Sequence, residues 1–183
     1  SRLISPFENE QDFRILLQLP DDIVSTAQEL EPPKIVQFPH YAIDGEVGQD
    51  GKYSLSIDIH AEGKGETYTG WFRHKKESRR SELIWIDKEA DLVGTEPIKC
   101  GPFSFRILVW DRDQLSSIDQ KIGTGIRSIR KDLDAVAGIS IYRDGFRVLP
   151  YGEPEDDWLR LDIRRVQNPT LRLSNNQITG YIK

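Results

Sequence analysis

The chain has 183 residues, enough for one large domain with a proper hydrophobic core. Hydrophobic residues make up 37% and charged residues 30%, which is typical of a globular domain with a polar surface and excludes a largely disordered chain. The net charge of −5 disfavours a protein that binds nucleic acid mainly through bulk electrostatics. The single cysteine, Cys100, excludes an internal disulfide and a cysteine metal cluster, and it favours a reducing compartment.

No targeting or membrane segment is predicted. The apolar runs are only a few residues long, and the first residues, SRLISPFENE, lack the apolar core of a signal peptide. We therefore expect no membrane contact and a cytoplasmic protein, or a nuclear one in a eukaryote. The chain contains no Met and stops at GYIK within a predicted strand, so we expect a fragment of a longer protein.

The first half of the chain predicts a strand, a helix and then a hairpin. Residues 11–19 alternate as a short strand does, and residues 21–29 follow as a short helix with two aspartates at its start. The proline-punctuated residues 31–41 predict an extended edge segment, so residues 1–40 form a linker or edge region before a core of residues 41–183. Two strands, YAIDGEV and KYSLSIDIHAE, are joined by a turn.

A basic segment, RHKKESRRSE at residues 73–82, follows the next predicted strand. Runs of charge usually remain solvated, so it predicts an exposed loop. The alternative is a contact with phosphate or DNA.

The second half predicts further strands around one helix. The strand 100–113 is apolar enough toward its end to be buried on both faces, and residues 124–137 form a helix that stops at Gly138. A hairpin turns at Asp144-Gly145, residues 150–158 form a loop, and residues 159–165 form a short strand or turn. With a last strand at 176–183, the predicted fold is α+β: a mostly antiparallel sheet with two or three helices in a single domain.

Catalytic motifs are lacking in the sequence. There is no G-x-S-x-G elbow and no phosphate-binding loop, and His40, His60 and His74 are too isolated to suggest a metal site. We therefore expect the chain by itself to have no catalytic residues and no cofactor of its own.

One acidic loop suggests an alternative function. The segment LVWDRDQLSSIDQKIG resembles the third-loop signature of the calcium- and phospholipid-binding β-sandwich first seen in protein kinase C. That resemblance implies Asp111, Asp113 and Asp119 as oxygen ligands of calcium in a calcium-dependent phospholipid- or protein-binding module. The other interpretation is a polar turn that ends a buried strand. No partner loop with a second aspartate pair is present.

The C-terminal quarter carries the most specific motif. A strand-turn-strand, GISIYRDGFR, is followed by PYG, an acidic stretch with DWL, an arginine pair and RLSNNQITGY. This run resembles a segment of the GHKL-type ATPases (the group of gyrase, the heat-shock chaperone, histidine kinases and MutL), most closely the MORC-like and prokaryotic MORC-related branch. The matching residues are Gly138, 141–145, Arg147, 150–152, 157–159, Arg164, Arg165 and 172–180.

The resemblance implies the transducer-like portion of such an ATPase, with a ribosomal-protein-type βαβ fold. The E-x-x-x-N and D-x-G-x-G motifs of the ATP-binding domain are absent here, so ATP and magnesium would be bound by a neighbouring N-terminal domain. That domain, a second copy of the chain and, for the parent protein, DNA are the implied partners. The Lys or Arg that senses the terminal phosphate has no match, and we expect it beyond Lys183.

The same stretch contains the candidate residues for coupling to the ATP-binding domain. The candidates are Arg143, Asp144, Arg147, Tyr151, Asp157, Trp158, Arg164, Arg165, Arg172, Asn175 and Asn176. Two interpretations are open for the acidic and basic side chains: exposed ion pairs that add little stability, or a docking surface. The residues Asn175, Asn176 and Gln177 are expected to cap backbone groups rather than to meet a partner. Packing alone gives no reason for the tail PYGEPEDDW.

Overall fold

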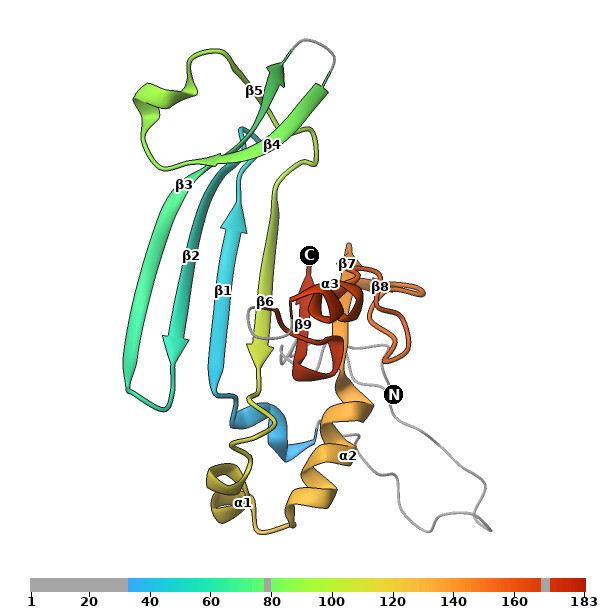
Figure 1. The fold of residues 1–183 in the computed structure, drawn as a ribbon. Helices are drawn as coiled ribbons and strands as arrows, with labels where there is room; N and C mark the ends of the chain where they lie inside the picture. Colours follow the sequence, from blue (N-terminus) through green and yellow to red (C-terminus); the bar gives the residue numbers. More distant parts are fainter. Residues whose placement is uncertain (1–32, 78–79, 169–171) are drawn as a thin grey trace.

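The structure, a computed structural model, describes residues 33–77, 80–168 and 172–183. In this part of the chain a nine-stranded, mostly antiparallel sheet combines with three α-helices, which confirms the predicted α+β class (Figure 1). The strand predicted at residues 11–19 and the helix predicted at 21–29 lie outside the described residues.

The sheet has the strand order β4-β3-β2-β1-β6-β9-β7-β8, and β5 pairs with β3. Every pairing is antiparallel except that of β7 with β9. The strands are β1 Tyr41–Val47, β2 Lys52–Ile59, β3 Lys64–Glu77, β4 Arg80–Ile86, β5 Thr95–Pro97, β6 Phe103–Val109, β7 Gly138–Arg143, β8 Phe146–Val148 and β9 Ile178–Ile182.

The helices lie in the connections between the strands, except for the first 3-10 helix, which precedes β1. The α-helices are α1 Ser116–Ile122, α2 Ile126–Val136 and α3 Leu161–Gln167, and the 3-10 helices are η1 Lys34–Gln37, η2 Glu89–Leu92 and η3 Asn175–Gln177. Within the described ranges, no helix combines the length and the apolar character needed to cross a bilayer.

Two apolar clusters hold the elements together. At one end of β1 and β6, the helices α1, α2 and η1 enclose the larger one (Figure 1), which comprises Ile35, Ala42, Leu108, Trp110, Leu115, Ile118, Ile129 and Leu133. In α2, which lies within the helix predicted at residues 124–137, Ile129 and Leu133 are buried, whereas Ile126 stays 40% exposed. The smaller cluster comprises Val109, Ile139 and Ile178, with Trp158, Leu159 and Leu161 packed against it.

The hairpin of β7 and β8 forms as predicted. Asp144 and Gly145 both have positive φ angles, 53° and 80°, which a two-residue primed turn requires. The ladder runs from Ile141 opposite Val148 to Arg143 opposite Phe146.

Several local predictions are wrong. Residues 159–165 belong mostly to α3 rather than to a strand, because the Asp157 carboxylate accepts the first two backbone N–H groups of that helix, those of Leu161 and Asp162. Residues 116–122 form α1 rather than a loop, and residues 34–37 form η1 rather than an extended edge because Ile35 turns into the core.

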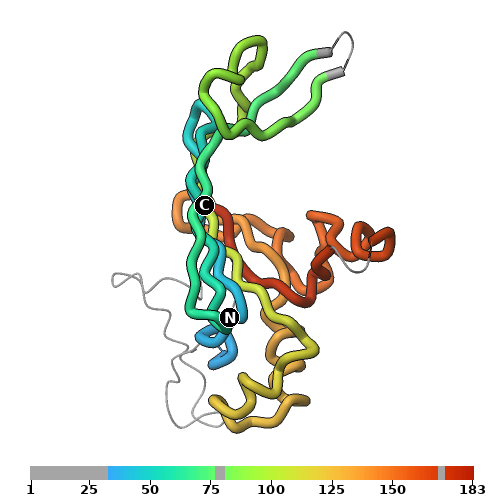
Figure 2. Tube along the Cα trace, turned by 60° about the vertical axis from the view of Figure 1, so that its left-hand side comes forward, coloured from blue at the N-terminus to red at the C-terminus, as the bar shows by residue number. Residues whose placement is uncertain are grey.

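The basic segment is also not a loop. Most of residues 73–82 lies in β3 and β4, which pair from Trp71 opposite Ile86 to Glu77 opposite Arg80. Side-chain contacts support these strands: Arg73 Nε donates to Thr95 Oγ1 at 3.1 Å, and the ion pair of Lys76 with Glu96 measures 2.7 Å. With β5, the two strands form an arm, residues 71–97, that extends away from the helices (Figure 2).

Candidate functional site

The residues of the C-terminal motif fold into one unit on the β7 and β9 side of the sheet. We call residues 138–168 and 172–182 the motif block. The unit is dense because Gly152 lies directly on β7: a Cβ at this glycine would meet the Ser140 backbone nitrogen at 2.6 Å. Gly138 faces the same glycine, and its Cβ would meet the Gly152 carbonyl oxygen at 3.2 Å. The glycine of PYG is therefore required by packing, and the prediction that packing does not demand the tail is wrong.

Trp158 anchors the acidic loop to the sheet. Its indole Nε1 donates to the Ile139 carbonyl oxygen of β7 at 2.8 Å. The ring of Tyr151 meets the Trp158 ring edge to face, with centroids 5.2 Å apart. Since Trp158 also packs on the smaller apolar cluster, the loop is held by both polar and apolar contacts.

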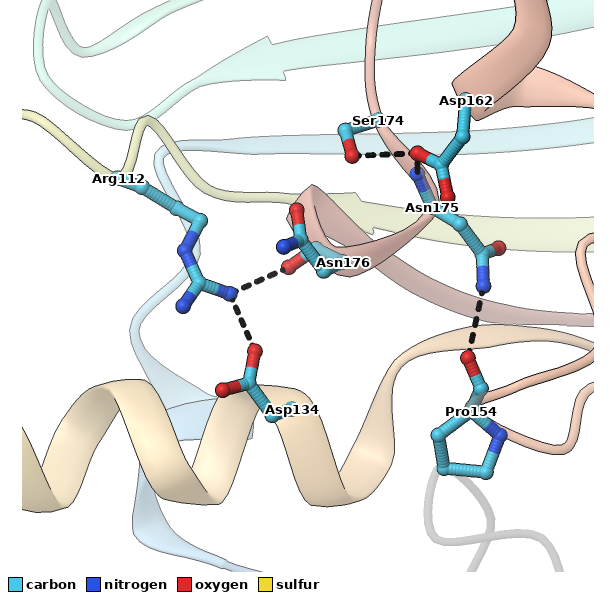
Figure 3. A network of polar contacts seen from close by, with 7 residues as sticks. All are labelled: Arg112, Asp134, Pro154, Asp162, Ser174, Asn175 and Asn176. Atoms are coloured by element: carbon cyan, nitrogen blue, oxygen red, sulfur yellow. Dashed lines mark hydrogen bonds and ion pairs between the residues drawn. The ribbon is translucent and has the colours of Figure 1, made fainter.

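Asp162 joins α3 to the 3-10 helix η3. Its Oδ1 accepts the Ser174 hydroxyl at 2.5 Å and the Asn175 backbone N–H at 2.9 Å (Figure 3). Asn175 is buried, and its Nδ2 donates a hydrogen bond to the Pro154 carbonyl oxygen at 3.2 Å. One short series of hydrogen bonds therefore links α3, η3 and the acidic loop. These three segments are not connected to one another by strand pairing.

Of the three residues predicted to cap backbone groups, Asn175 and Gln177 bind backbone groups through their side chains. Ser174 and Gln177 form a capping box around η3, in which Gln177 Oε1 accepts the Ser174 backbone N–H at 3.0 Å. The side chain of Asn176 is exposed, while its backbone carbonyl is used inside the molecule.

Arg112 connects the motif block to α2. Its Nη1 lies 2.7 Å from Asp134 Oδ1 on the helix and donates to the Asn176 carbonyl oxygen at 3.0 Å (Figure 3). A second link runs from Thr179 Oγ1 of β9 to the Val136 carbonyl oxygen at the end of α2, at 2.6 Å. The helix α2 and the motif block are thus fastened to each other at two points.

Arg147 forms an inner ion pair rather than a surface one. Its Nη2 lies 3.1 Å from Glu153 Oε1 and donates to the Tyr151 carbonyl oxygen at 3.1 Å, and only 3% of its side chain is exposed. In contrast, Arg143 and Asp144 are 3.8 Å apart and are 86% and 90% exposed, so their ion pair contributes little to stability.

The outward side of the motif block is basic and partly apolar. We call Ile163, Arg164, Arg165, Val166 and Arg172 the outer face; all five are exposed, and the four consecutive residues of α3 project to different sides of this short helix. The nearby carboxylates of Asp157 and Asp162 accept hydrogen bonds from groups inside the block. These two carboxylates are therefore engaged within the block, although Asp162, like Glu155 of the neighbouring loop, remains exposed to solvent.

The predicted site residues separate into two sets. An inner set, Arg147, Tyr151, Asp157, Trp158 and Asn175, holds the motif block together. An outer set, Arg143, Asp144, Arg164, Arg165, Arg172 and Asn176, has exposed side chains. Sequence reasoning missed Arg112, Asp134 and Asp162, because their partners lie twelve or more residues away in the chain.

The aspartates of the calcium alternative serve local turns. Asp111 Oδ1 accepts the Asp113 backbone N–H at 2.9 Å, and Asp119 Oδ1 accepts the Gly125 backbone N–H at 2.7 Å. In the described ranges, no three His, Cys, Asp or Glu side chains are grouped so that they could hold a metal ion. The observed contacts correspond to the interpretation of this loop as a polar turn after a buried strand.

His40 lies against the same turn. Its Nδ1 accepts the Asp111 backbone N–H at 3.0 Å, and burial lowers the pKa of this histidine below its usual value of 6.5, against the raising effect of the nearby Asp111 carboxylate. The imidazole therefore has a structural role as an acceptor.

Comparisons with protein-family models, with curated proteins and with solved structures gave no match to this chain.

Proposed function

We propose that this chain is the non-catalytic transducer portion of a GHKL, MORC-like ATPase. It couples the nucleotide state of a neighbouring ATP-binding domain to dimerisation or to a downstream module. The observation that carries the proposal is that the described residues of the motif run, 138–168 and 172–182, form one cross-linked block with an exposed, arginine-rich outer face. ATP and magnesium belong to the neighbouring domain in this proposal.

The construction of the motif block suits a part that moves as a unit. Its loop, α3 and η3 are tied by hydrogen bonds to each other and to β7, and Arg112 and Thr179 tie the block to α2. A force applied at α3 would therefore reach β7, β9 and α2 together, as rigid-body coupling requires.

The outer face supplies the contact with the ATP-binding domain. Arginine guanidinium groups recognise carboxylates and phosphates through paired hydrogen bonds, and Ile163 and Val166, 50% and 82% exposed, add apolar area. A surface of this kind suits a protein partner with acidic side chains. A second copy of the chain and DNA are further partners of the parent protein in the proposal, at other surfaces.

The proposal is tested by charge reversal in the parent protein. Arg164→Glu combined with Arg165→Glu is expected to lower ATP turnover at least about tenfold, because the docked state loses its charge complementarity. The matched control is Arg127→Glu with Arg130→Glu, two exposed arginines on α2, which should leave turnover near that of the unmodified protein.

Two results would contradict the proposal. One is equal turnover in both double variants. The other is a parent sequence without E-x-x-x-N and D-x-G-x-G motifs in the part preceding Ser1.

A further inference from the structure

In the described part of the chain, the strand β4 has one unpaired edge. Among the described strands it pairs only with β3, as the outermost strand of the sheet. Its Leu83 is 58% exposed and its Trp85 72% exposed, and both alternate onto the same face of the strand. An outer row of backbone N–H and C=O groups is therefore flanked by large apolar side chains.

Among the described residues, the usual protection of a sheet edge is missing at the second half of β4, residues 83–86. Proteins blunt their edges with very short strands, with charged side chains, with Pro, or with a covering element. The opposite edge of this sheet follows that rule, since β8 has only three residues. The seven residues of β4, RSELIWI, are charged only in the first half, at Arg80 and Glu82, and they end in four consecutive apolar residues. An edge of this composition is suited to pairing with another strand.

We propose that β4 pairs in an antiparallel manner with β4 of a second copy of this chain. The evidence is the self-complementarity of the strand. A two-fold axis perpendicular to the sheet leaves each side chain on the same face of the sheet. The axis must therefore pass between one residue of β4 and the same residue of the second copy. With the axis at Ile84, Leu83 of each copy lies opposite Trp85 of the other, and the exposed side chains cover one another.

Neighbouring positions of the axis fit less well. An axis at Glu82 places two carboxylates opposite each other, which is unfavourable in a cross-strand pair. An axis at Leu83 leaves Trp85 opposite Ser81, so the largest exposed side chain gains little contact. Of these three registers, the one centred on Ile84 brings the exposed Leu83 and Trp85 of the two copies together best.

The dimer does not depend on the proposed ATPase function, because β4 lies in the arm and not in the motif block. It is tested first by sedimentation of the chain over a range of concentrations. Dimers are expected, and Leu83→Lys or Trp85→Lys should raise the dissociation constant at least about tenfold. Val93→Lys is the matched control: Val93 is 89% exposed on the same arm but lies outside β4, so the dimer should persist. Unchanged thermal melting of each variant would show that the monomer stays folded.

Cross-linking then tests the register. In a Cys100→Ser background, Ile84→Cys places two thiols opposite each other at the axis, and mild oxidation should give a disulfide-linked dimer. In Glu82→Cys the two thiols lie about 13 Å apart along the strands, so little cross-linking is expected. A chain that stays monomeric, a dimer that tolerates both lysine variants, or equal cross-linking from both cysteine positions would overturn the proposal.

Discussion

At the scale of single residues, His40 makes the fold sensitive to pH. Its neutral imidazole accepts the Asp111 backbone N–H through Nδ1, and burial lowers its pKa below 6.5. The unfolded chain therefore binds the proton more readily than the folded chain does. The stability that His40 contributes is complete above pH 6.5 and is lost as the pH falls through the lowered folded pKa.

This predicts a pH-dependent difference between the protein and a His40→Gln variant. The free energy of unfolding, measured by urea denaturation at pH 7.5 and pH 5, should fall more on acidification in the unmodified protein than in the variant. A variant that loses as much stability as the unmodified protein over this range would show that His40 does not titrate with folding.

At the scale of elements, side chains rather than strand pairing connect the parts of the motif block. Asp162 illustrates this, because it receives hydrogen bonds from both Ser174 and Asn175 and so fastens α3 to η3. Removal of the acceptor leaves the buried Ser174 hydroxyl and Asn175 N–H without their partner. Such groups cost about 1–3 kcal/mol when left unsatisfied.

Asp162→Ala should accordingly lower the free energy of unfolding by about 1–3 kcal/mol. Glu155→Ala, an exposed change in the neighbouring loop, should stay within about 0.5 kcal/mol of the unmodified protein. Chemical denaturation of the two variants measures both changes in the free energy of unfolding. Equal stability of the two variants would mean that the hydrogen bonds of Figure 3 do not hold the block.

The elements themselves were predictable where the periodicity was strong. The β1–β2 hairpin, the buried end of β6, the helix α2 and the Asp144-Gly145 turn follow from local pattern. The helix α3 does not, since LRLDIRR alternates as a strand would, and the helix begins only because Asp157 accepts its first amides. The charged residues 73–77 hid the second half of β3, which pairs with β4 and contacts Thr95 and Glu96 of β5.

At the scale of the whole molecule, the sheet carries two separate surfaces. The arm extends from one side through β3, and the motif block sits on β7 and β9 at the other side (Figures 1 and 2). In the sequence, only the C-terminal motif indicated that the residues of the motif block form one unit. The construction of this block, in which Asp157 and Asp162 bind groups inside the block while Arg164, Arg165 and Arg172 stay exposed, depends on contacts between segments far apart in the chain.

Hydrogen–deuterium exchange of the parent protein, with and without a non-hydrolysable ATP analogue, tests the coupling most directly. Docking of the outer face should slow exchange of the backbone amides of α3 and of the β7–β8 hairpin when the analogue binds, while the arm at residues 71–97 exchanges unchanged. Unaltered exchange throughout residues 138–182, in a sample whose ATP-binding domain is protected by the analogue, would contradict the account.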